Sequence, residues 1–390
     1  MGRGRFGSAL VLTVVAGLVA LPTPALADPC GDGGDELVLE DASGWQWDLN
    51  PSGSANDGIG DAFDGYPDIE VGGAGYPDAA ANGCTHEDGG REILYPEATL
   101  GGLEVSRKVF VPDEGLAFAR FLTLLRNAGA GPVTTTYLFT GNLGSDGSTR
   151  IRLTSSGDDV ASVGDAWAIS DDTSTSPDRD DPTILHVWDG TAPAAPQAAS
   201  TITWPTTGDD GPEIMYDVTV PPGATFVFLH LVGQRGGMPE ATPDAPLLAA
   251  GAPDVFVGMS SDELTALRNW VLPTCRGKTA THFGTASDDV LAGTSAGDVI
   301  LAGDGDDQVS GLGGNDTICA GDGDDRVNGG GGKDVIAGED GNDNLKGAGG
   351  NDRLLGGPGS DALNGGPGKK DTCKGGPGLD TAKACEKGKA

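Results

Sequence analysis

The sequence predicts a mostly β protein in two parts, an N-terminal β-sandwich followed by a C-terminal parallel β-roll of nonapeptide repeats. Three observations support this division. Glycine accounts for 67 of the 390 residues, about 17% against a usual share of ~7%. Phe, Trp and Tyr do not occur after Phe283, and aspartate recurs every nine residues in that same region.

The chain is strongly acidic. It has 24 Lys and Arg against 58 Asp and Glu, and its formal net charge is −34. Nucleic acids and anionic membrane surfaces attract basic patches, so we expect no nucleic acid as a partner and no anionic membrane surface. Cations are the partners that this charge favours.

Residues 1–27 are predicted to be a secretory signal peptide. Two arginines precede an apolar run that ends near Leu21, and the small residues around Ala27 form a cleavage site before Asp28. The run is shorter than the ~20 residues of a membrane span, and no later run reaches that length. We therefore expect a secreted, extracellular protein with no transmembrane segment after cleavage.

Six cysteines follow the signal peptide. They are Cys30, Cys84, Cys275, Cys319, Cys373 and Cys385. An even number in an exported chain indicates disulfides, and a zinc site is disfavoured because there is no CxxC pair and no His beside any two of them. Proximity in the sequence favours the pairs Cys30–Cys84, Cys275–Cys319 and Cys373–Cys385.

Residues 28–259 are predicted to form the β-sandwich, whose function the sequence does not reveal. Short runs rich in Val, Thr, Phe and Tyr recur between turn signals, which is typical of antiparallel strands. The clearest runs are 103–111, 116–126, 133–140, 183–188 and 225–232. The segment 127–132 between two of these runs predicts a hairpin connection.

Residues 260–283 are predicted to form one helix and a linker. Ser260 and Glu263 make a capping box, which marks a helix start. Apolar residues from Leu264 to Val271 fall on one helical face, and a proline two residues later ends the helix.

Residues 284–385 form an array of nine-residue units, and residues 386–390 a Lys-rich tail. The aspartates of the array are Asp289, Asp298, Asp307, Asp316, Asp325, Asp334, Asp343, Asp352, Asp361 and, after one inserted residue, Asp371 and Asp380. The unit reads Gly-Gly-x-Gly-x-Asp-x-U-x, where U is an aliphatic residue such as Ile300 or Val309. Alternation along a short strand points U inward and its two neighbours outward.

This unit resembles the hemolysin-type (RTX) calcium-binding repeat, over about 100 residues and roughly eleven units. The resemblance implies a parallel β-roll in which each calcium ion is shared by consecutive loops on one edge, two units apart. Glycine turns expose carbonyl oxygens and the aspartate adds a carboxylate, which together are the hard oxygen ligands that calcium prefers. The residues predicted to bind multiple Ca²⁺ ions are Asp298, Gly303, Gly305, Asp307, Gly314, Asp316, Gly323, Asp325, Gly332, Asp334, Gly341, Asp343, Gly350, Asp352, Gly359, Asp361, Asp371 and Asp380.

The first two units depart from the pattern. Ser287 and Ala296 stand where later units have their fourth-position glycine. We expect these two units to bind calcium poorly or to cap the roll. The strongest sites are expected between Asp307 and Asp325.

The sequence identifies no catalytic motif, which favours a protein that is not an enzyme. Gly293–Gly297 fits the GxSxG string of serine hydrolases, but it lies on the nonapeptide register and no histidine follows it. His86 has no second histidine four residues later, so the HExxH zinc motif is absent. His186 and His230 lie in apolar runs and are expected in the core or on the surface rather than as ligands.

Two acidic loops leave alternatives open. They contain Asp57, Asp61, Asp64 and Asp68, and Asp178, Asp180 and Asp181. Either loop is a candidate for a metal site or for catalytic carboxylates, although solvated acidic loops are common.

Residues 107–146 resemble sugar-active supersandwich domains. This resemblance identifies no catalytic residue. Two alternatives stay open for the N-terminal region: an enzyme acting on extracellular polysaccharide, or a surface-binding or adhesion module whose partner is a polysaccharide or a cell surface.

Overall fold

The computed structural model describes most of the chain. The described residues are 37–50, 52–57, 63, 65–77, 84–87, 90–141, 143, 149–171, 182–190, 197–204, 211–368 and 370–386. The predicted signal peptide, Cys30 and residues 387–390 lie outside them. In this part of the chain, no helix is both long enough and apolar enough to cross a bilayer.

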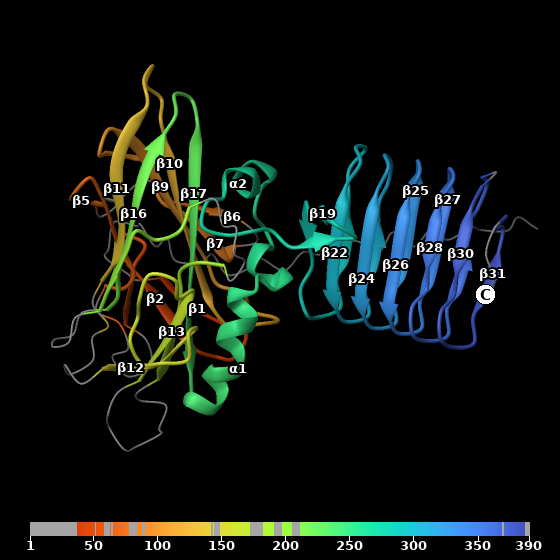
Figure 1. Ribbon diagram of the computed structural model, residues 1–390, viewed down its shortest axis with the longest axis horizontal. Helices are drawn as coiled ribbons and strands as arrows, with labels where there is room; N and C mark the ends of the chain where they lie inside the picture. Colours follow the sequence, from red (N-terminus) through yellow and green to blue (C-terminus); the bar gives the residue numbers. More distant parts are fainter. Residues whose placement is uncertain are drawn as a thin grey trace, which may run out of the picture.

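The described residues form a β-sandwich and a parallel β-solenoid that lie side by side (Figure 1). Almost all regular elements are strands, and only two α-helices occur among the described residues, which confirms the predicted mostly β fold. The coils of the solenoid follow one another away from the sandwich, and the C-terminus lies at the far end.

The larger sheet of the sandwich has nine strands. Their order is β12-β13-β14-β17-β10-β9-β7-β6, with β8 paired to β9. The bounds are β6 (Thr85–Glu87), β7 (Glu92–Leu94), β8 (Ala98–Leu100), β9 (Leu103–Phe110), β10 (Ala119–Arg126), β12 (Arg150–Thr154), β13 (Trp167–Asp171), β14 (Thr183–Val187) and β17 (Thr225–Arg235). All of its pairings are antiparallel.

The smaller sheet has five strands in the order β15-β16-β11-β4-β5. Its strands are β4 (Asp68–Val71), β5 (Ala74–Gly75), β11 (Val133–Thr140), β15 (Thr201–Thr203) and β16 (Glu213–Val220). A separate sheet precedes it in the chain and contains β1 (Leu37–Glu40), β2 (Gln46–Leu49) and β3 (Ala55–Asp57).

Aromatic side chains fill the space between the two large sheets. Tyr137 of β11 lies 4.8 Å from Phe228 of β17, measured between ring centroids. Phe139 of β11 stacks on His230 of β17 at 3.8 Å. These strands belong to different sheets, so the contacts confirm the predicted sandwich. Each fully buried aromatic pair of this kind adds to the stability expected from area burial alone.

The predicted hairpin at residues 127–132 is wrong. The two strands that it joins lie in different sheets, because β10 pairs with β9 and β17 whereas β11 pairs with β4 and β16. The side chain of Asn127 is buried and donates to the carbonyl oxygens of Gly131 and Val220, both at 2.8 Å. These contacts hold the segment as a crossover between sheets.

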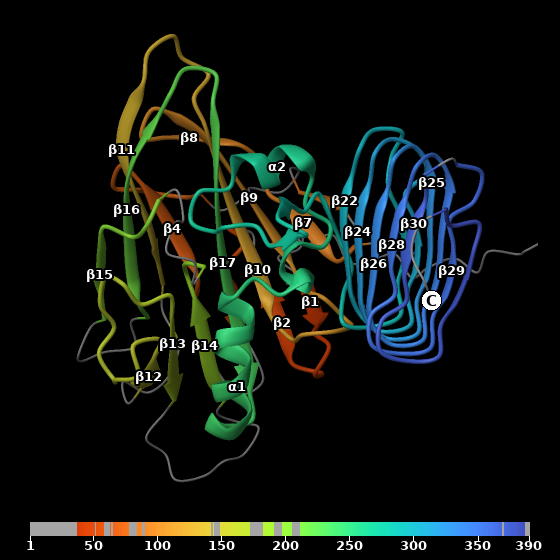
Figure 2. The ribbon, with the colours of Figure 1, turned by 45° about the vertical axis from the view of Figure 1, so that its right-hand side comes forward.

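Helices cover the outer face of the larger sheet, on the side toward the solenoid (Figure 2). They are α1 (Met238–Ala249), the short 3₁₀ turn η2 (Pro253–Phe256) and α2 (Ser261–Ala266). Ala241, Ala245 and Leu248 of α1 pack against the apolar side chains of that face. Helix α1 was not predicted, because prolines at 243 and 246 interrupt it and normally argue against a helix interior.

Helix α2 begins as predicted and ends early. Ser260 and Glu263 form the capping box. The helix stops at Ala266, whereas the sequence predicts apolar positions continuing to Val271. The backbone of Leu267 is extended, and the nitrogen of Arg268 donates to the carbonyl of Val227 in β17 at 2.9 Å. Pairing with the sheet therefore replaces the last helical turns.

The solenoid consists of two parallel sheets of six strands each. The first contains β20 (His282–Phe283), β22 (Val299–Asp304), β24 (Thr317–Asp322), β26 (Val335–Asp340), β28 (Arg353–Leu355) and β30 (Thr372–Lys374). The second contains β21 (Val290–Ala292), β23 (Gln308–Ser310), β25 (Arg326–Gly331), β27 (Asn344–Gly349), β29 (Ala362–Asn364) and β31 (Thr381–Lys383). A small hairpin of β18 (Thr274–Cys275) and β19 (Lys278–Thr279) precedes them.

Two nonapeptide units make one coil. Ile300 aligns with Ile318, and Ile318 with Ile336, so neighbouring strands of one sheet are 18 residues apart. Most of the aliphatic U residues are buried in one continuous core, with Val309 only 1% exposed, as the alternation predicts. The inserted residue near Lys370 lengthens one coil to 19 residues, and Leu354 therefore aligns with Cys373.

The neighbours of U do not all face solvent, which corrects the simple alternation. On the first sheet Val299, Cys319 and Ala337 point away from the solenoid core, yet each is buried. They pack in one apolar cluster with Phe256 and Trp270 of the sandwich part. The outer face of this sheet is therefore the surface that holds the two parts of the protein together.

Two of the three predicted disulfides are confirmed. Cys275 pairs with Cys319, which joins the segment after the sandwich to β24. Cys373 pairs with Cys385 at the last coil. The third predicted pair includes Cys30 and so lies outside the described residues.

Candidate metal centre

Two columns of aspartates run along the two edges of the solenoid, at the turns that precede the strands. One column contains Asp289, Asp307, Asp325, Asp343, Asp361 and Asp380, and the other contains Asp298, Asp316, Asp334, Asp352 and Asp371. From Asp307 to Asp371 every one of these side chains is at most 2% exposed. Buried carboxylates of this kind require partners.

One carboxylate oxygen of each central aspartate is already engaged. The backbone nitrogen of Asp307 donates to Oδ1 of Asp325 at 2.8 Å, and the nitrogen of Asp325 donates to Oδ1 of Asp343 at 3.1 Å. The same contact links successive aspartates along both columns. The aspartates therefore fix the stacking of each coil on the next.

The second oxygen is buried without a hydrogen-bond partner among the residues that the structure describes. This is true of Oδ2 in Asp307, Asp316, Asp325, Asp334, Asp343, Asp352, Asp361 and Asp371. A buried polar atom without a partner is costly, and most such atoms in proteins have one. A hard cation prefers oxygen ligands, so it would provide the missing partner for these eight buried carboxylate oxygens.

Burial and mutual repulsion raise the pKa of these carboxyl groups. The pKa of Asp307, Asp325 and Asp343 is raised to about 7 and that of Asp334 to about 6, chiefly because burial disfavours the charged form. Neighbouring aspartates of the same column add to the rise. A divalent cation bound among these groups would favour the charged carboxylates and so would oppose the rise in pKa that burial and repulsion cause.

The fourth-position glycines bring the loops of adjacent coils into close contact. Gly332 has φ +136°, and a Cβ there would lie 1.5 Å from the carbonyl oxygen of Gly314. The other predicted glycine ligands share a positive φ and the same closeness to the preceding loop: Gly303, Gly305, Gly314, Gly323, Gly341, Gly350 and Gly359. The loops thus bring backbone carbonyl oxygens, which are further hard ligands, beside the aspartate columns.

Residues 283–318, 320–345 and 338–369 match the family of RTX calcium-binding nonapeptide repeats, with four copies. The solenoid is an array of RTX calcium-binding repeats. This confirms the resemblance drawn from the Gly/Asp pattern, and the geometry of the columns fits the calcium that such repeats bind. No curated protein matches the chain.

Two solved structures show a weak likeness to the chain. A polysaccharide lyase is 15% identical, with a TM-score of 0.30, over 54% of this chain and 32% of its own. A protein named as an aldose 1-epimerase candidate from Klebsiella pneumoniae is 12% identical, with a TM-score of 0.26, over 56% of this chain and 79% of its own. The chain spans about a third of the lyase. The predicted polysaccharide or surface role of the N-terminal region gains no support from these likenesses.

The first two RTX units differ from the others. Oδ2 of Asp289 accepts hydrogen bonds from the backbone nitrogen and the hydroxyl of Thr285, at 2.6 and 2.9 Å. Thr294 makes the same two contacts with Oδ2 of Asp298, at 2.6 and 3.0 Å. Asp298 was predicted as a ligand, but it lacks the partnerless oxygen of the eight central aspartates.

The last RTX coil also differs. Asp380 is half-buried, and its Oδ1 accepts from the backbone nitrogen of Asp361 at 3.1 Å. The nitrogen of Asp371, the last aspartate of its column among the described residues, donates to Oε2 of Glu386 at 2.7 Å. Neither this glutamate nor the two threonines was predicted from the sequence, although Thr285 and Thr294 stand where later units have mostly glycine.

The remaining candidates do not form a site in the described residues. His186 is buried between Tyr66 and Ser170, with ring-nitrogen contacts of 2.9 and 2.8 Å, and His230 is buried beside Phe139. Both are core residues. Gly293–Gly297 forms a turn of the repeat, as predicted.

The two acidic loops are largely outside the described residues. Asp61, Asp64, Asp178, Asp180 and Asp181 are not described, nor is the side chain of Asp57. Asp68 accepts a hydrogen bond from Ser54 at 3.1 Å. In the part of the chain that the structure describes, the repeat columns included, no group of three or more His, Cys, Asp or Glu side chains is arranged to hold a metal. A cation at the columns would therefore also need backbone carbonyl oxygens as ligands.

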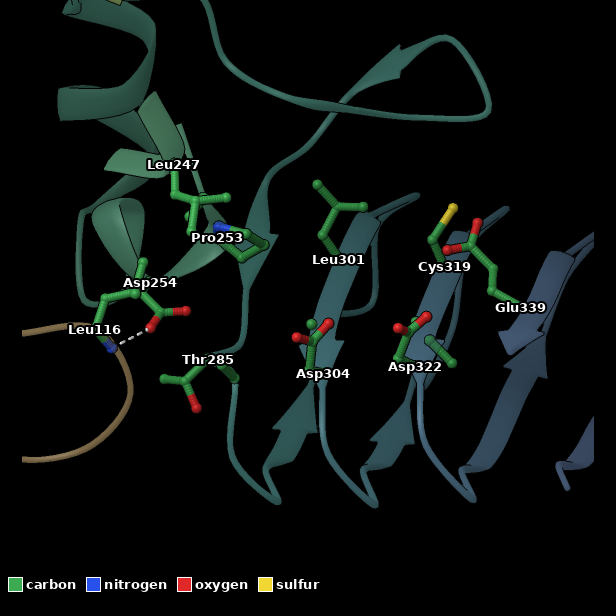
Figure 3. Close-up of a pocket in the computed structure, with 15 residues that line it drawn as sticks. Leu116, Leu247, Pro253, Asp254, Thr285, Leu301, Asp304, Cys319, Asp322 and Glu339 are labelled. Atoms are coloured by element: carbon green, nitrogen blue, oxygen red, sulfur yellow. Dashed lines mark hydrogen bonds between the residues drawn. The ribbon is translucent and has the colours of Figure 1, made fainter. Parts of the chain in front are cut away.

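A pocket of about 340 Å³ lies between the sandwich part and the RTX array (Figure 3). Leu116, Leu247 and Pro253 line one side, and Asp304 and Asp322 project from the strands of the array. Asp254 is buried at its edge and accepts from the backbone nitrogen of Leu116 at 2.9 Å. The pocket marks the boundary between the two parts and belongs to their interface.

Proposed function

We propose that this is a secreted calcium-binding protein whose C-terminal roll folds around Ca²⁺ ions bound along its two edges. The observation that carries the proposal is the set of eight buried Oδ2 atoms without a hydrogen-bond donor in the described chain. Calcium supplies the positive charge that offsets their burial and mutual repulsion. Because a folded column binds the ions and an unfolded chain does not, binding and folding are coupled.

The ligands that we propose are the eight central aspartates together with carbonyl oxygens of the glycine loops. The predicted glycines, such as Gly323 and Gly341, bring consecutive loops of one edge together. If each partnerless oxygen takes part in one site, the array holds up to eight ions. Asp380, at the C-terminal end of its column, stays a predicted ligand. Asp298 was also predicted, but Thr294 already donates to its Oδ2, so Asp298 is not among the ligands that we propose.

We propose that residues 1–27 direct the chain out of the cell and that the roll folds outside, where calcium is abundant. The two disulfides agree with an oxidising compartment. In this proposal residues 28–259 form the sandwich part, 260–283 the connection and 284–385 the roll. An enzymatic, polysaccharide-binding or adhesive role of the sandwich stays a prediction.

Native mass spectrometry of the full mature chain, with and without calcium, tests the proposal. We expect several ions to bind in the absence of any other ligand, and none to bind in excess chelator. Asp325→Asn should reduce the number of bound ions or weaken their binding. Asp322→Asn should do neither, because Asp322 is an exposed residue of the same turn. A wild-type chain that binds no calcium at millimolar concentration would overturn the proposal.

A further inference from the structure

We propose that the first coil of the roll, residues 284–301, is independent of metal, because Thr285 and Thr294 take the place of calcium. This inference rests on the proposed function and adds to it where along the array calcium is needed. It makes the first coil a preformed end on which the calcium-dependent coils assemble.

The contacts of the two threonines are the same in both units. In each, the backbone nitrogen and the hydroxyl of the threonine donate to Oδ2 of the aspartate four residues later. Each hydroxyl oxygen also accepts from the backbone nitrogen two residues later, that of Ser287 at 3.1 Å and that of Ala296 at 3.0 Å. A short loop is thereby closed by hydrogen bonds alone, and the carboxylate oxygen that later units leave without a donor has two.

Later units cannot use this arrangement. At the second position they carry glycine or a residue with positive φ, such as Leu312 and Ala348, both at +66°. In those two units Oδ2 of Asp316 and Asp352 has no donor in the described chain. Neither threonine has a positive φ. The first two units, in which a threonine without a positive φ donates to the aspartate, therefore do not need a cation, whereas the later units do.

A second observation is independent of the threonines. The first coil is anchored to the sandwich part. The ring of Phe283, which directly precedes the coil, lies 5.1 Å from that of Phe256, and Val299 of the coil is buried in the same cluster. The hydroxyl of Thr281 accepts from the nitrogen of Val299 at 3.0 Å. In Figure 3 the loop that carries Thr285 lies opposite Leu116 and Asp254. Cys319 and Ala337 extend the cluster into the next two coils, and beyond Ala337 no described residue is a fully buried member of it.

The anchored coil presents donors to the coil that follows. The backbone nitrogens of Asp289 and Asp298 donate to Oδ1 of Asp307 and Asp316, at 2.8 and 2.9 Å. Asp307 and Asp316 are the first residues of their columns with a partnerless Oδ2. The first coil thus offers two backbone donors to the first coil whose aspartates keep a partnerless oxygen.

Hydrogen exchange on the full chain, read by mass spectrometry in excess chelator and in excess calcium, tests the inference. In chelator we expect backbone amides of residues 284–301 to stay protected while those of residues 326–383 exchange freely, a difference of at least roughly tenfold in rate. The double variant Thr285→Gly/Thr294→Gly should lose this protection in chelator and regain it with calcium. The matched control Ala348→Gly changes the same repeat position where no threonine contact exists, and it should leave the first coil protected.

The outcomes separate the inference from the proposed function. If the wild-type first coil exchanges as freely as the rest in chelator, or if the double variant keeps its protection, the inference is wrong even though calcium still orders the roll. If calcium changes exchange nowhere in the roll, the proposed function itself fails. A second readout is the number of bound ions, which the double variant should raise by one or two. Each introduced glycine removes the hydroxyl donor and allows the positive φ of the later units, in which Oδ2 has no donor in the described chain.

Discussion

Oε2 of Glu386 accepts a hydrogen bond from the backbone nitrogen of Asp371 at 2.7 Å. Everywhere else in that column the acceptor is Oδ1 of an aspartate one coil further on. Glu386 follows Cys385 directly, and Cys385 is bonded to the buried Cys373. The disulfide thus holds a carboxylate at the end of the column, beside the last coil that the structure describes.

Removing this disulfide should destabilise the last coil. For Cys373→Ala/Cys385→Ser we expect the loss of about 3 kcal/mol that a short disulfide loop contributes in the chain-entropy estimate. The end of the roll should therefore unfold at lower denaturant concentration in saturating calcium. The measurement is urea unfolding of the full chain, followed by hydrogen exchange of residues 362–386.

The control for that variant is Glu386→Ala with both cysteines present. It removes only the hydrogen bond between the nitrogen of Asp371 and the exposed Glu386. We therefore expect the free energy of unfolding to fall by only about 0.5–1.5 kcal/mol. If the two variants behave alike, the disulfide acts only by holding the glutamate. Peptide mapping that finds Cys373 as a free thiol would contradict the pairing itself.

Calcium should drive the folding of the roll with weak affinity. We expect a midpoint on the order of 10⁻⁴–10⁻³ M, the range of extracellular calcium modules. Asp316→Ala, Asp325→Ala and Asp334→Ala should together raise this midpoint sharply, because each removes a carboxylate whose Oδ2 lacks a donor. Asp289→Ala should change it little, since Thr285 already satisfies that oxygen.

Far-UV circular dichroism during a calcium titration of the full chain measures the midpoint. We expect the signal of the sandwich not to change with calcium, so that the change reports the roll. A roll spectrum that survives excess chelator in the wild type would contradict calcium-driven folding. A midpoint shift for Asp289→Ala as large as that of the triple variant would contradict the distinction between the units.

The calcium-free roll should become more stable as the pH falls. The folded-state pKa of Asp307, Asp325 and Asp343 is raised to about 7 by burial and by neighbouring carboxylates, whereas an unfolded aspartate titrates near ~4. Between these values the folded roll binds more protons than the unfolded chain, so its stability rises as pH decreases. Protons compete with calcium, so the calcium midpoint should rise over the same range.

Circular dichroism of the calcium-free chain from pH 8 to pH 5 checks this prediction. Asp307→Asn/Asp325→Asn/Asp343→Asn should flatten the pH dependence. The matched triple variant Asp304→Asn/Asp322→Asn/Asp340→Asn changes exposed carboxylates on the same turns and should keep it. An equal effect of both triples would assign the pH response to the overall negative charge instead of the buried columns.

Gly332→Ala should disrupt the stacking of two loops. Its Cβ would meet the carbonyl oxygen of Gly314 at 1.5 Å, and its φ of +136° is unfavourable for alanine, by about 1–3 kcal/mol from the backbone alone. We expect a higher calcium midpoint and a lower thermal midpoint. Gly331→Ala is the matched control, because its nearest non-neighbouring atom lies 4.0 Å away and its φ is not positive. Equal effects would contradict the close loop contact.

The repeat could be predicted in detail from the sequence. The nine-residue spacing from Asp289 onward defines the turns, and the aliphatic residue two positions after each aspartate forms the solenoid core. The pairings of Cys275 with Cys319 and Cys373 with Cys385 also followed from the sequence, because each pair is closer along the chain than the alternatives. These features depend on neighbours within one or two units.

The sandwich was less predictable. Its strands could be recognised, but not their partners, and the segment after Arg126 therefore became a hairpin in the prediction and a crossover in the structure. Helix α2 stops where Arg268 bonds Val227 of β17, a contact between residues more than 40 positions apart. The helix preference of residues 264–271 alone does not predict that pairing with a distant strand replaces the last helical turns.

By itself the sequence determined the period of the roll, the identity of the columns and the kind of ion that they suit, because each depends on a local repeat of residue types. Only the tertiary structure decided which aspartates keep a partnerless oxygen. Thr294 satisfies Oδ2 of Asp298, whereas Oδ2 of Asp316, one coil later, has no donor in the described chain. Tertiary packing also decided that Val299, Cys319 and Ala337 are buried, since it places the sandwich part against their face of the roll. Hydrogen bonds and apolar burial depend on distances between atoms, and only the folded chain sets those distances.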